Sequence, residues 1–359
     1  MTEWKEYKLG ELIDIKYGKD HKQLSDGIYP IYGSGGIMRY GDKYLCDKES
    51  ILIPRKGSLN NIFYEDKAFW TVDTMFWSEI DCSKICPKFL YYQLTLVDFE
   101  NLNVGSAVPS LTIPIINDID VSLPSIEEQK RITGVLSSLD DKIDLLRREN
   151  ATLEAMAETL FRQWFVVEAK EDWEEGKLGD EFDFTMGQSP SGNSFNEEGI
   201  GIPMYQGNAD FGFRFPTKRV FTTQPTRFAK PNDTLISVRA PVGAQNMATE
   251  KCCIGRGVAA FRYRSNPSFY SYTYYKLKSL IEEIKQFNDN GTVFGSISKS
   301  DFENLDIVIP DEETISKFQD QVKAIDDKII NNNKQIQTLI QTRNGLLPRL
   351  MGGVLKVEK

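Results

Sequence analysis

The sequence has only one histidine, His21, among its 359 residues, so histidine-based acid–base catalysis would depend on that side chain alone. It contains no Asn/Asp-Pro-Pro-Tyr/Phe motif for amino-group methylation, no Walker phosphate-binding loop and no Gly-x-Ser-x-Gly nucleophile motif. Nothing in it resembles the metal-binding cluster of a nuclease. We therefore expect a protein that is not an enzyme and that binds no catalytic cofactor or metal of its own.

Long apolar runs and a cysteine framework are also missing. No stretch of about 18 apolar residues occurs, and the N-terminus lacks the basic and apolar regions of a signal peptide, so we expect a cytoplasmic protein without a membrane span. The odd number of cysteines indicates reduced thiols. Cys82 and Cys86 have the spacing of half a zinc site, but no second ligand pair follows them. The composition, 40% hydrophobic and 26% charged, is typical of a soluble globular protein.

Acidic residues outnumber basic ones overall, but the basic residues are concentrated in one segment. The net charge is −9, which argues against a nucleic-acid partner. Between Tyr205 and Arg264, however, ten basic residues stand against three acids, a local charge of +7. Such a patch is typical of phosphate binding, and a solvated basic face without a partner is the alternative.

A long helix with the apolar pattern of a coiled coil occurs twice. Its residues of the a/d seam are separated by alternating steps of four and three. In the first copy they are Ile132, Leu136, Leu139, Ile143, Leu146, Asn150, Leu153, Ala157, Leu160 and Trp164. Adding 186 gives the second copy: Phe318, Val322, Ile325, Ile329, Asn332, Ile336, Leu339, Arg343 and Leu346. The quartet Asp-Asp-Lys-Ile recurs unchanged, at 140–143 and 326–329.

The two seam asparagines indicate how the helices pair. Asn150 occupies an a-type position and Asn332 a d-type position, so only an antiparallel pair brings the two amides together. That register also places Leu146 opposite Ile336. A buried asparagine pair would fix the register. The alternative is that both asparagines point to solvent.

The segments before the helices are also repeated. Trp4 and the triplet Lys8-Leu9-Gly10 recur 169 residues later, so the second globular segment is 17 residues longer than the first. We expect a mixed α/β fold in which two globular domains alternate with two long helices that pair as an antiparallel, pseudo-twofold coiled coil. The expected boundaries are 1–123, 124–168, 169–309 and 310–355.

Each globular segment contains a buried strand that leads into an arginine and a glycine-containing turn. We align Arg55 with Arg239 and expect these turns, with the neighbouring polar loops, to face DNA, because Arg, Asn and Gln read base edges. The same residue types are common in turns, so the alternative is that these residues only form the turns and do not contact DNA. The candidate DNA-binding residues are Arg55, Lys56, Ser58, Asn60, Asn61, Gln206, Asn208, Arg214, Lys218, Arg219, Arg239, Gln245 and Asn246. Residues 34–36 and 206–208 form rival loops.

The order of segments and several motifs resemble the specificity subunit of type I restriction-modification enzymes. The motifs are Leu123-Pro124-x-x-x-Glu128-Gln129-x-x-Ile132, Asp140-Asp141-Lys142-Ile143, Gly105-Ser106, and the ending Leu346-Leu347-Pro348-Arg349-Leu350-Met351-Gly352-Gly353. The resemblance covers essentially the whole chain. One departure is that Thr314-Ile315 stands in the second helix where the first has Glu128-Gln129, which suggests less symmetric docking of a partner.

The resemblance implies an adaptor in which each target recognition domain reads half of a split DNA target and the helix pair sets the spacing. It also implies two modification subunits, which bind S-adenosylmethionine and methylate adenine, and two restriction subunits, which use ATP and Mg²⁺. Two other classes remain: a structural coiled-coil protein that binds protein without DNA, and an enzyme with an unfamiliar site.

Overall fold

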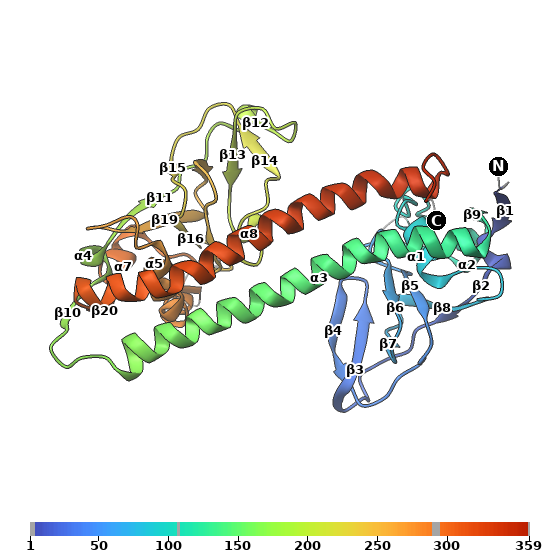
Figure 1. The fold of residues 1–359 in the computed structure, drawn as a ribbon, viewed down its shortest axis with the longest axis horizontal. Helices are drawn as coiled ribbons and strands as arrows, with labels where there is room; N and C mark the ends of the chain where they lie inside the picture. Colours follow the sequence, from blue (N-terminus) through green and yellow to red (C-terminus); the bar gives the residue numbers. More distant parts are fainter. Residues whose placement is uncertain (1–3, 106–107, 289–294, 358–359) are drawn as a thin grey trace. The chain divides into compact units, whose positions relative to one another are not determined.

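The computed structural model describes residues 4–105, 108–288 and 295–357 (Figure 1). The chain forms two compact units. The first unit comprises Met1–Leu146 and Gln335–Lys359, and the second comprises Arg147–Lys334. No helix within the described ranges is long and apolar enough to cross a membrane.

The first unit is built on three small sheets. A two-stranded antiparallel sheet pairs β1 (Lys5–Lys8) with β9 (Asp120–Leu123). A four-stranded antiparallel sheet has the order β2 (Ile13–Tyr17), β8 (Met75–Ile80), β5 (Ser50–Pro54) and β6 (Phe63–Glu65). A three-stranded sheet has the order β4 (Gly36–Gly41), β3 (Asp26–Gly33) and β7 (Trp70–Thr71). The short helices are η1 (Leu9–Glu11), α1 (Pro87–Leu94) and α2 (Ile113–Asn117).

The second unit repeats this plan with additional strands. β10 (Glu174–Lys177) pairs with β20 (Asp306–Ile309). The next sheet has the order β11 (Phe182–Met186), β19 (Val258–Tyr263), β16 (Thr234–Ser237) and β17 (Gln245–Met247). The third has the order β12 (Phe195–Asn196), β14 (Val220–Thr222), β13 (Ile202–Tyr205), β18 (Cys252–Ile254) and β15 (Phe228–Ala229). The short helices are α4 (Leu178–Glu181), η3 (Gly192–Ser194), η4 (Asn208–Asp210), α5 (Tyr270–Ser279), α6 (Ile281–Lys285), η5 (Gln286–Asn288) and α7 (Lys299–Glu303).

The central strands explain why the sequence shows no alternating pattern there. β5 reads Ser-Ile-Leu-Ile-Pro and β16 reads Thr-Leu-Ile-Ser, and every residue of both is buried. A strand that is covered on both faces needs a continuous apolar run. These two strands therefore hold fixed the residues that follow them.

Two long helices cross from one unit to the other: α3 (Ile126–Arg162), extended by the π-helical turn η2 (Gln163–Val167), and α8 (Glu312–Met351). Within the first unit Ile143 and Leu146 bury themselves against Ile336, and Asp140 accepts a 2.8 Å hydrogen bond from Arg343. Residues nearer the start of α3 thus contact residues nearer the end of α8, so the two helices run antiparallel. The predicted layer of Leu146 and Ile336 is confirmed.

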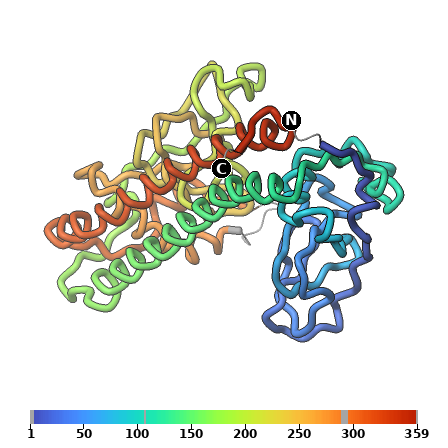
Figure 2. Tube along the Cα trace, turned by 45° about the vertical axis from the view of Figure 1, so that its right-hand side comes forward, coloured from blue at the N-terminus to red at the C-terminus, as the bar shows by residue number. Residues whose placement is uncertain are grey.

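The second unit shows the same antiparallel direction (Figure 2). Asn332 Nδ2 donates a 2.9 Å hydrogen bond to Asn150 Oδ1, and both side chains are buried. Further along, the rings of Phe161 and Phe318 meet at 5.6 Å. The expected asparagine pair is therefore present, and neither amide points to solvent. The antiparallel coiled coil and the mixed α/β fold are confirmed.

Candidate nucleic-acid interface

In the first unit the two rival polar loops form one surface. Residues 34–36 include the connection from β3 to β4 and the first residue of β4, and residues 55–61 follow β5. Asn61 Nδ2 donates a 3.0 Å hydrogen bond to the backbone oxygen of Ser34. Gly57 has φ +93°, and a Cβ added there would lie 2.6 Å from Ser34 Oγ. The close approach of the loops thus depends on glycine at that position.

In the second unit the corresponding loops both contact a short turn between β18 and β19. The backbone N–H of Gly255 donates to Tyr205 O at 2.8 Å, beside the loop at 206–208. Gly257 O accepts from the N–H of Val238 at 2.9 Å, directly before Arg239. The turn is closed by a 3.0 Å bond from Val258 N–H to Gly255 O. We call residues 255–258 the central turn of the second unit.

The first unit has a central turn of the same construction at residues 72–75. Val72 N–H donates to Tyr32 O at 3.0 Å, Thr74 O accepts from the N–H of Arg55 at 2.8 Å, and Met75 N–H closes the turn on Val72 O at 2.9 Å. These residues match those of the second unit bond for bond. The sequence analysis did not include either central turn among the candidates, although the Gly-Arg-Gly at 255–257 was a visible signal.

The backbone pairing corrects our alignment of the two arginines. Leu111 N–H donates to Arg55 O, whereas Ile297 N–H donates to Val238 O. Lys56 and Arg239 each form an isolated antiparallel bridge, to Ser110 and Ser296 respectively. The equivalent of Arg239 is therefore Lys56, and the predicted pairing of Arg55 with Arg239 was wrong by one residue. The sequence match placed two arginines together, but the strand register is set by hydrogen bonds to neighbouring strands.

Arg55 itself is held against the protein. Its Nη1 donates a 3.2 Å hydrogen bond to the backbone oxygen of Asp73, and its guanidinium lies 5.4 Å from the centre of the Tyr17 ring. The side chain is half-buried. Arg55 therefore supports the central turn of the first unit from one side.

The remaining candidates differ in how far they reach solvent. Exposed residues are Lys56, Ser58, Asn60, Asn61, Gln206, Asn208, Lys218, Arg219 and Arg239. Some of these already have partners. Lys218 forms an ion pair with Glu250, and Arg219 Nη2 lies 2.8 Å from Asp210. Asn60 Oδ1 accepts a 2.8 Å hydrogen bond from the backbone N–H of Phe99, so this side chain fixes a loop.

Arg214 does not face solvent, and its prediction as a DNA contact is wrong. Its side chain is 1% exposed and donates to Asp326 Oδ1 at 2.9 Å and to the Tyr275 hydroxyl at 3.2 Å. The guanidinium lies 3.3 Å from the centre of the Tyr274 ring. Burial raises the pKa of Asp326 above its ordinary value, although the charge of Arg214 opposes that shift. Arg214 therefore stabilises the interior of the second unit. The composition of the surrounding basic segment does not show which of its basic residues are buried.

Asn246 is also turned inward. It is fully buried, and its Nδ2 donates to Gly212 O at 2.8 Å. The neighbouring Gln245 is half-buried and donates to Tyr274 O at 2.7 Å. Both lie on β17, whose backbone pairs with β16. Asn246 as a DNA-facing residue is thus contradicted, and Gln245 is engaged with the interior.

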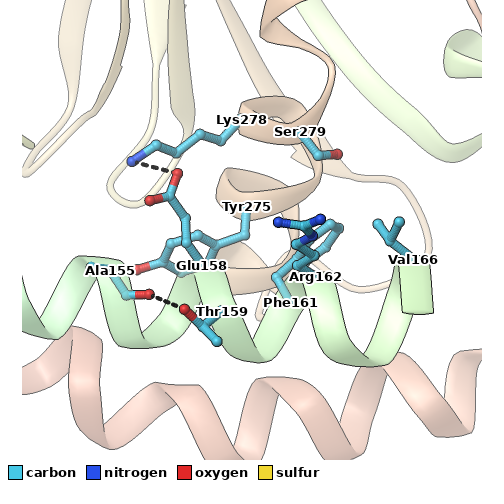
Figure 3. A pocket seen from close by; sticks show the side chains of 9 residues that line it. All are labelled: Ala155, Glu158, Thr159, Phe161, Arg162, Val166, Tyr275, Lys278 and Ser279. Carbon is cyan, nitrogen blue, oxygen red and sulfur yellow. Dashed lines mark hydrogen bonds and ion pairs between the residues drawn. The ribbon is translucent and has the colours of Figure 1, made fainter. Parts of the chain in front are cut away.

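An open groove of about 470 Å³ lies between α3 and α5 of the second unit (Figure 3). Lys278 and Glu158 form an ion pair at 3.0 Å on its rim, and Thr159 donates to Ala155 O at 2.8 Å. The other lining residues are Phe161, Arg162, Val166, Tyr275 and Ser279. Within the described ranges no three His, Cys, Asp or Glu side chains are grouped in a way that could hold a metal ion.

The geometry defines a protein with two similar polar surfaces, each a set of turns around one central turn, and a helix pair that runs through both units. The chain matches the family model described as type I restriction modification DNA specificity domain over residues 1–155 and 170–341. It belongs to that family.

Known relatives and one solved structure agree with this assignment. The putative type I restriction enzyme MjaX specificity subunit of Methanocaldococcus jannaschii is 31% identical over 77% of this chain and 70% of that protein. The MjaIX specificity subunit of the same organism is 26% identical over 100% of this chain and 98% of that protein. The crystal structure of a type I restriction-modification system S subunit from M. genitalium superimposes with a TM-score of 0.62 at 20% identity, covering 97% of this chain and 96% of that one.

The chain is accordingly a type I restriction-modification DNA specificity subunit, and these comparisons give no support to a coiled-coil adaptor that does not bind DNA.

Proposed function

We propose that each unit reads one half of a split DNA target and that the helix pair sets the separation of the halves. The observation that carries this is the repeated surface: the same three hydrogen bonds frame the central turn in both units, with different side chains on it. A duplicated frame with unlike residues suits an asymmetric target. The exposed residues Lys56 and Arg239, at matching positions, would contact the DNA backbone.

The chemistry would come from partner subunits. Modification subunits that bind S-adenosylmethionine would methylate adenine, and restriction subunits that use ATP and Mg²⁺ would cleave, while this chain supplies recognition alone. Family membership supports this division of labour. The groove between α3 and α5 is one surface on which a partner helix or loop could pack.

The test is to map methylated adenines in cells that express this chain with its modification subunits. We expect a two-part asymmetric motif with a fixed gap, which disappears when the gene for this chain is deleted. Binding of the purified complex to that motif should weaken steeply with salt. An unchanged methylation pattern after the deletion would overturn the proposal, as would methyl transfer by the isolated chain.

A further inference from the structure

The tips of the two central turns carry opposite charges. A further shared hydrogen bond links each turn to the glycine that follows β2 or β11: Gly18 N–H donates to Met75 O at 3.0 Å, and Gly187 N–H donates to Val258 O at 2.9 Å. Because the frames match bond for bond, the residue at the tip of one turn has a definite equivalent in the other. In the first unit it is Asp73, and in the second it is Arg256.

Arg256 has a fixed backbone and a free side chain. Its N–H donates to Ser189 Oγ at 3.2 Å, and a Cβ added to Gly257 would lie 2.1 Å from Gln206 O. The turn therefore packs tightly on the loop that follows β13, and position 257 admits no side chain. The Arg256 side chain is exposed and has no hydrogen bond or ion pair within the described part of the chain. Little conformational freedom remains to be lost except in the side chain itself.

The two described loops beside Arg256 are polar and carry no free carboxylate. Gln206 and Arg239 are exposed on the two loops that flank the turn. The nearest acid along the first of these loops, Asp210, is buried, where it accepts hydrogen bonds from Arg219 and from the N–H of Gln206. Nothing on these two loops therefore neutralises the Arg256 guanidinium.

Asp73 in the first unit is exposed, and basic residues lie on the segments beside it. Lys56 and Lys19 occupy the flanking segments, and Arg55 donates to the backbone oxygen of Asp73 rather than to its carboxylate. A carboxylate is repelled by phosphate and can only accept hydrogen bonds, so at a DNA surface its favourable partner is a base amino group.

We propose that Arg256 and Asp73 are the specificity-determining residues at the centre of the two reading surfaces. Arg256 makes a two-bond contact to the O6 and N7 atoms of a guanine in the major groove, and Asp73 accepts a hydrogen bond from the N4 amino group of a cytosine. This inference rests on the proposed function, and it identifies which base class each half of the target must contain at its centre.

The test uses the full chain in complex with its modification subunits and DNA that carries the mapped target. Every base pair of each half-site is replaced in turn, and binding of wild type, Arg256→Ala, Arg256→Lys and Asp73→Asn is measured. Arg264→Ala is the matched control, since Arg264 is an exposed arginine at the other end of β19, where it pairs with Asp183 at 3.0 Å.

We expect Arg256→Ala to weaken binding to the wild-type target roughly 5- to 150-fold and to abolish discrimination at one G·C pair of one half-site. Arg256→Lys should reduce that discrimination while keeping the salt dependence, because lysine keeps the charge but not the fork of donors. Asp73→Asn should change discrimination at one C·G pair of the other half-site only. Arg264→Ala should leave both half-sites unchanged.

The contrary results are distinct. If Arg256→Ala discriminates at every base pair as wild type does, whether or not it weakens binding to all sequences, Arg256 does not read a base and the inference fails. Relaxation at an A·T pair would also overturn it. These outcomes require a wild-type complex that binds its target, and failure of that binding would instead refute the proposed function.

Discussion

The two units treat the repeated aspartate of the long helices in different ways. Asp140 of α3 and Asp326 of α8 are equivalent, and each accepts a hydrogen bond from a tyrosine of the unit's short helix, from Tyr92 at 2.6 Å and from Tyr275 at 3.3 Å. The Asp140 side chain remains 24% exposed, whereas that of Asp326 is 2% exposed. The same contact is therefore made at the surface in one unit and in the interior in the other.

The source of the arginine explains this difference. Arg343, which pairs with Asp140, comes from the opposite long helix. Arg214, which pairs with Asp326, comes from the connection between β13 and β14. That connection lies in a longer segment, because Tyr205 and Val238 are 33 positions apart, while Tyr32 and Arg55 are 23 apart. The sequence suggests that these additional residues form a surface loop. In the structure they instead include a buried arginine that joins the recognition domain to a long helix.

A glutamine shows the opposite case, in which a sequence difference leaves the contact unchanged. Gln129 Oε1 accepts the N–H of Cys86 at 2.8 Å, at the start of α1. Gln319, which lies one turn further along its own helix, accepts the N–H of Ser271 at 2.9 Å, at the start of α5. Both side chains satisfy free donors at a helix N-terminus. Gln129 is buried, so a partner subunit does not contact it. The replacement of this glutamine by Ile315 in the second helix is therefore weak support for the expected asymmetric docking of a partner.

The largest effect should come from removing the buried arginine, Arg214. Arg214→Ala leaves Asp326 buried without its cation, whereas Glu154 keeps its ion pair with Lys278. We expect this change to lower the free energy of unfolding by about 3–5 kcal/mol. Arg343→Ala, the matched control, should cost less than about 1 kcal/mol because its ion pair is partly exposed. Urea denaturation of the full chain compares them. Equal losses of unfolding free energy in the two variants would show that the burial of the ion pair in the second unit does not make it more important for stability.

A second contrast is between Glu181 and its equivalent in the first unit, Leu12. Burial raises the pKa of Glu181 to about 7, although Lys276 and a 2.6 Å hydrogen bond from the Tyr272 hydroxyl oppose that shift. In the unfolded chain the carboxyl titrates near its ordinary value of 4.5. Between these two pH values the folded state binds more protons than the unfolded state, so this group makes stability fall as pH rises.

We expect a loss of about 2 kcal/mol from this group between roughly pH 5 and pH 7. Glu181→Gln removes the titrating carboxyl and should flatten that part of the stability profile, measured as urea midpoints across the range. Glu175→Gln, on the exposed part of β10, is the control and should leave the slope as it is. A slope that persists in Glu181→Gln would assign it to another group.

The asparagine pair of the second unit gives a smaller effect with a characteristic pattern. Asn332→Leu leaves Asn150 buried without its partner, at a cost of about 1–2 kcal/mol. Asn150→Leu should cost less, because Asn332 keeps a 3.0 Å hydrogen bond to Glu149 Oε2. The double variant replaces both amides with apolar side chains, as in the Leu146 and Ile336 layer of the first unit, and should recover most of the loss. Thermal unfolding of the four proteins measures the coupling. Additive losses would mean that the amides act independently.

The smallest effect should come from Lys56→Ala and Arg239→Ala. At equivalent exposed positions, each should weaken DNA binding by the complex by about 1 kcal/mol, for all sequences alike, and reduce the salt slope by about one. Arg55→Ala serves as the comparison. If Arg55 rather than Lys56 behaves like Arg239, the correction of the alignment is wrong.

Local patterns in the sequence were enough to predict the long helices, their antiparallel direction, the duplication and the family. The four-and-three spacing of apolar residues defines α3 and α8, since that spacing puts one stripe on one face of a helix. The unequal positions of Asn150 and Asn332 then require the antiparallel direction, because buried amides need partners. The duplication and the family could also be recognised from the sequence, because both are shown by motifs whose residues lie close together in the chain.

The tertiary structure alone decided which polar residues reach solvent. Arg214 and Asn246 lie in a basic, polar segment, yet both are buried, because their partners Asp326 and Gly212 are brought to them by folding. The equivalence of Lys56 with Arg239 was likewise hidden, since hydrogen bonds between strands distant in sequence set the register. Helix periodicity is a local property of the chain, whereas burial and strand pairing depend on contacts that exist only in the folded protein.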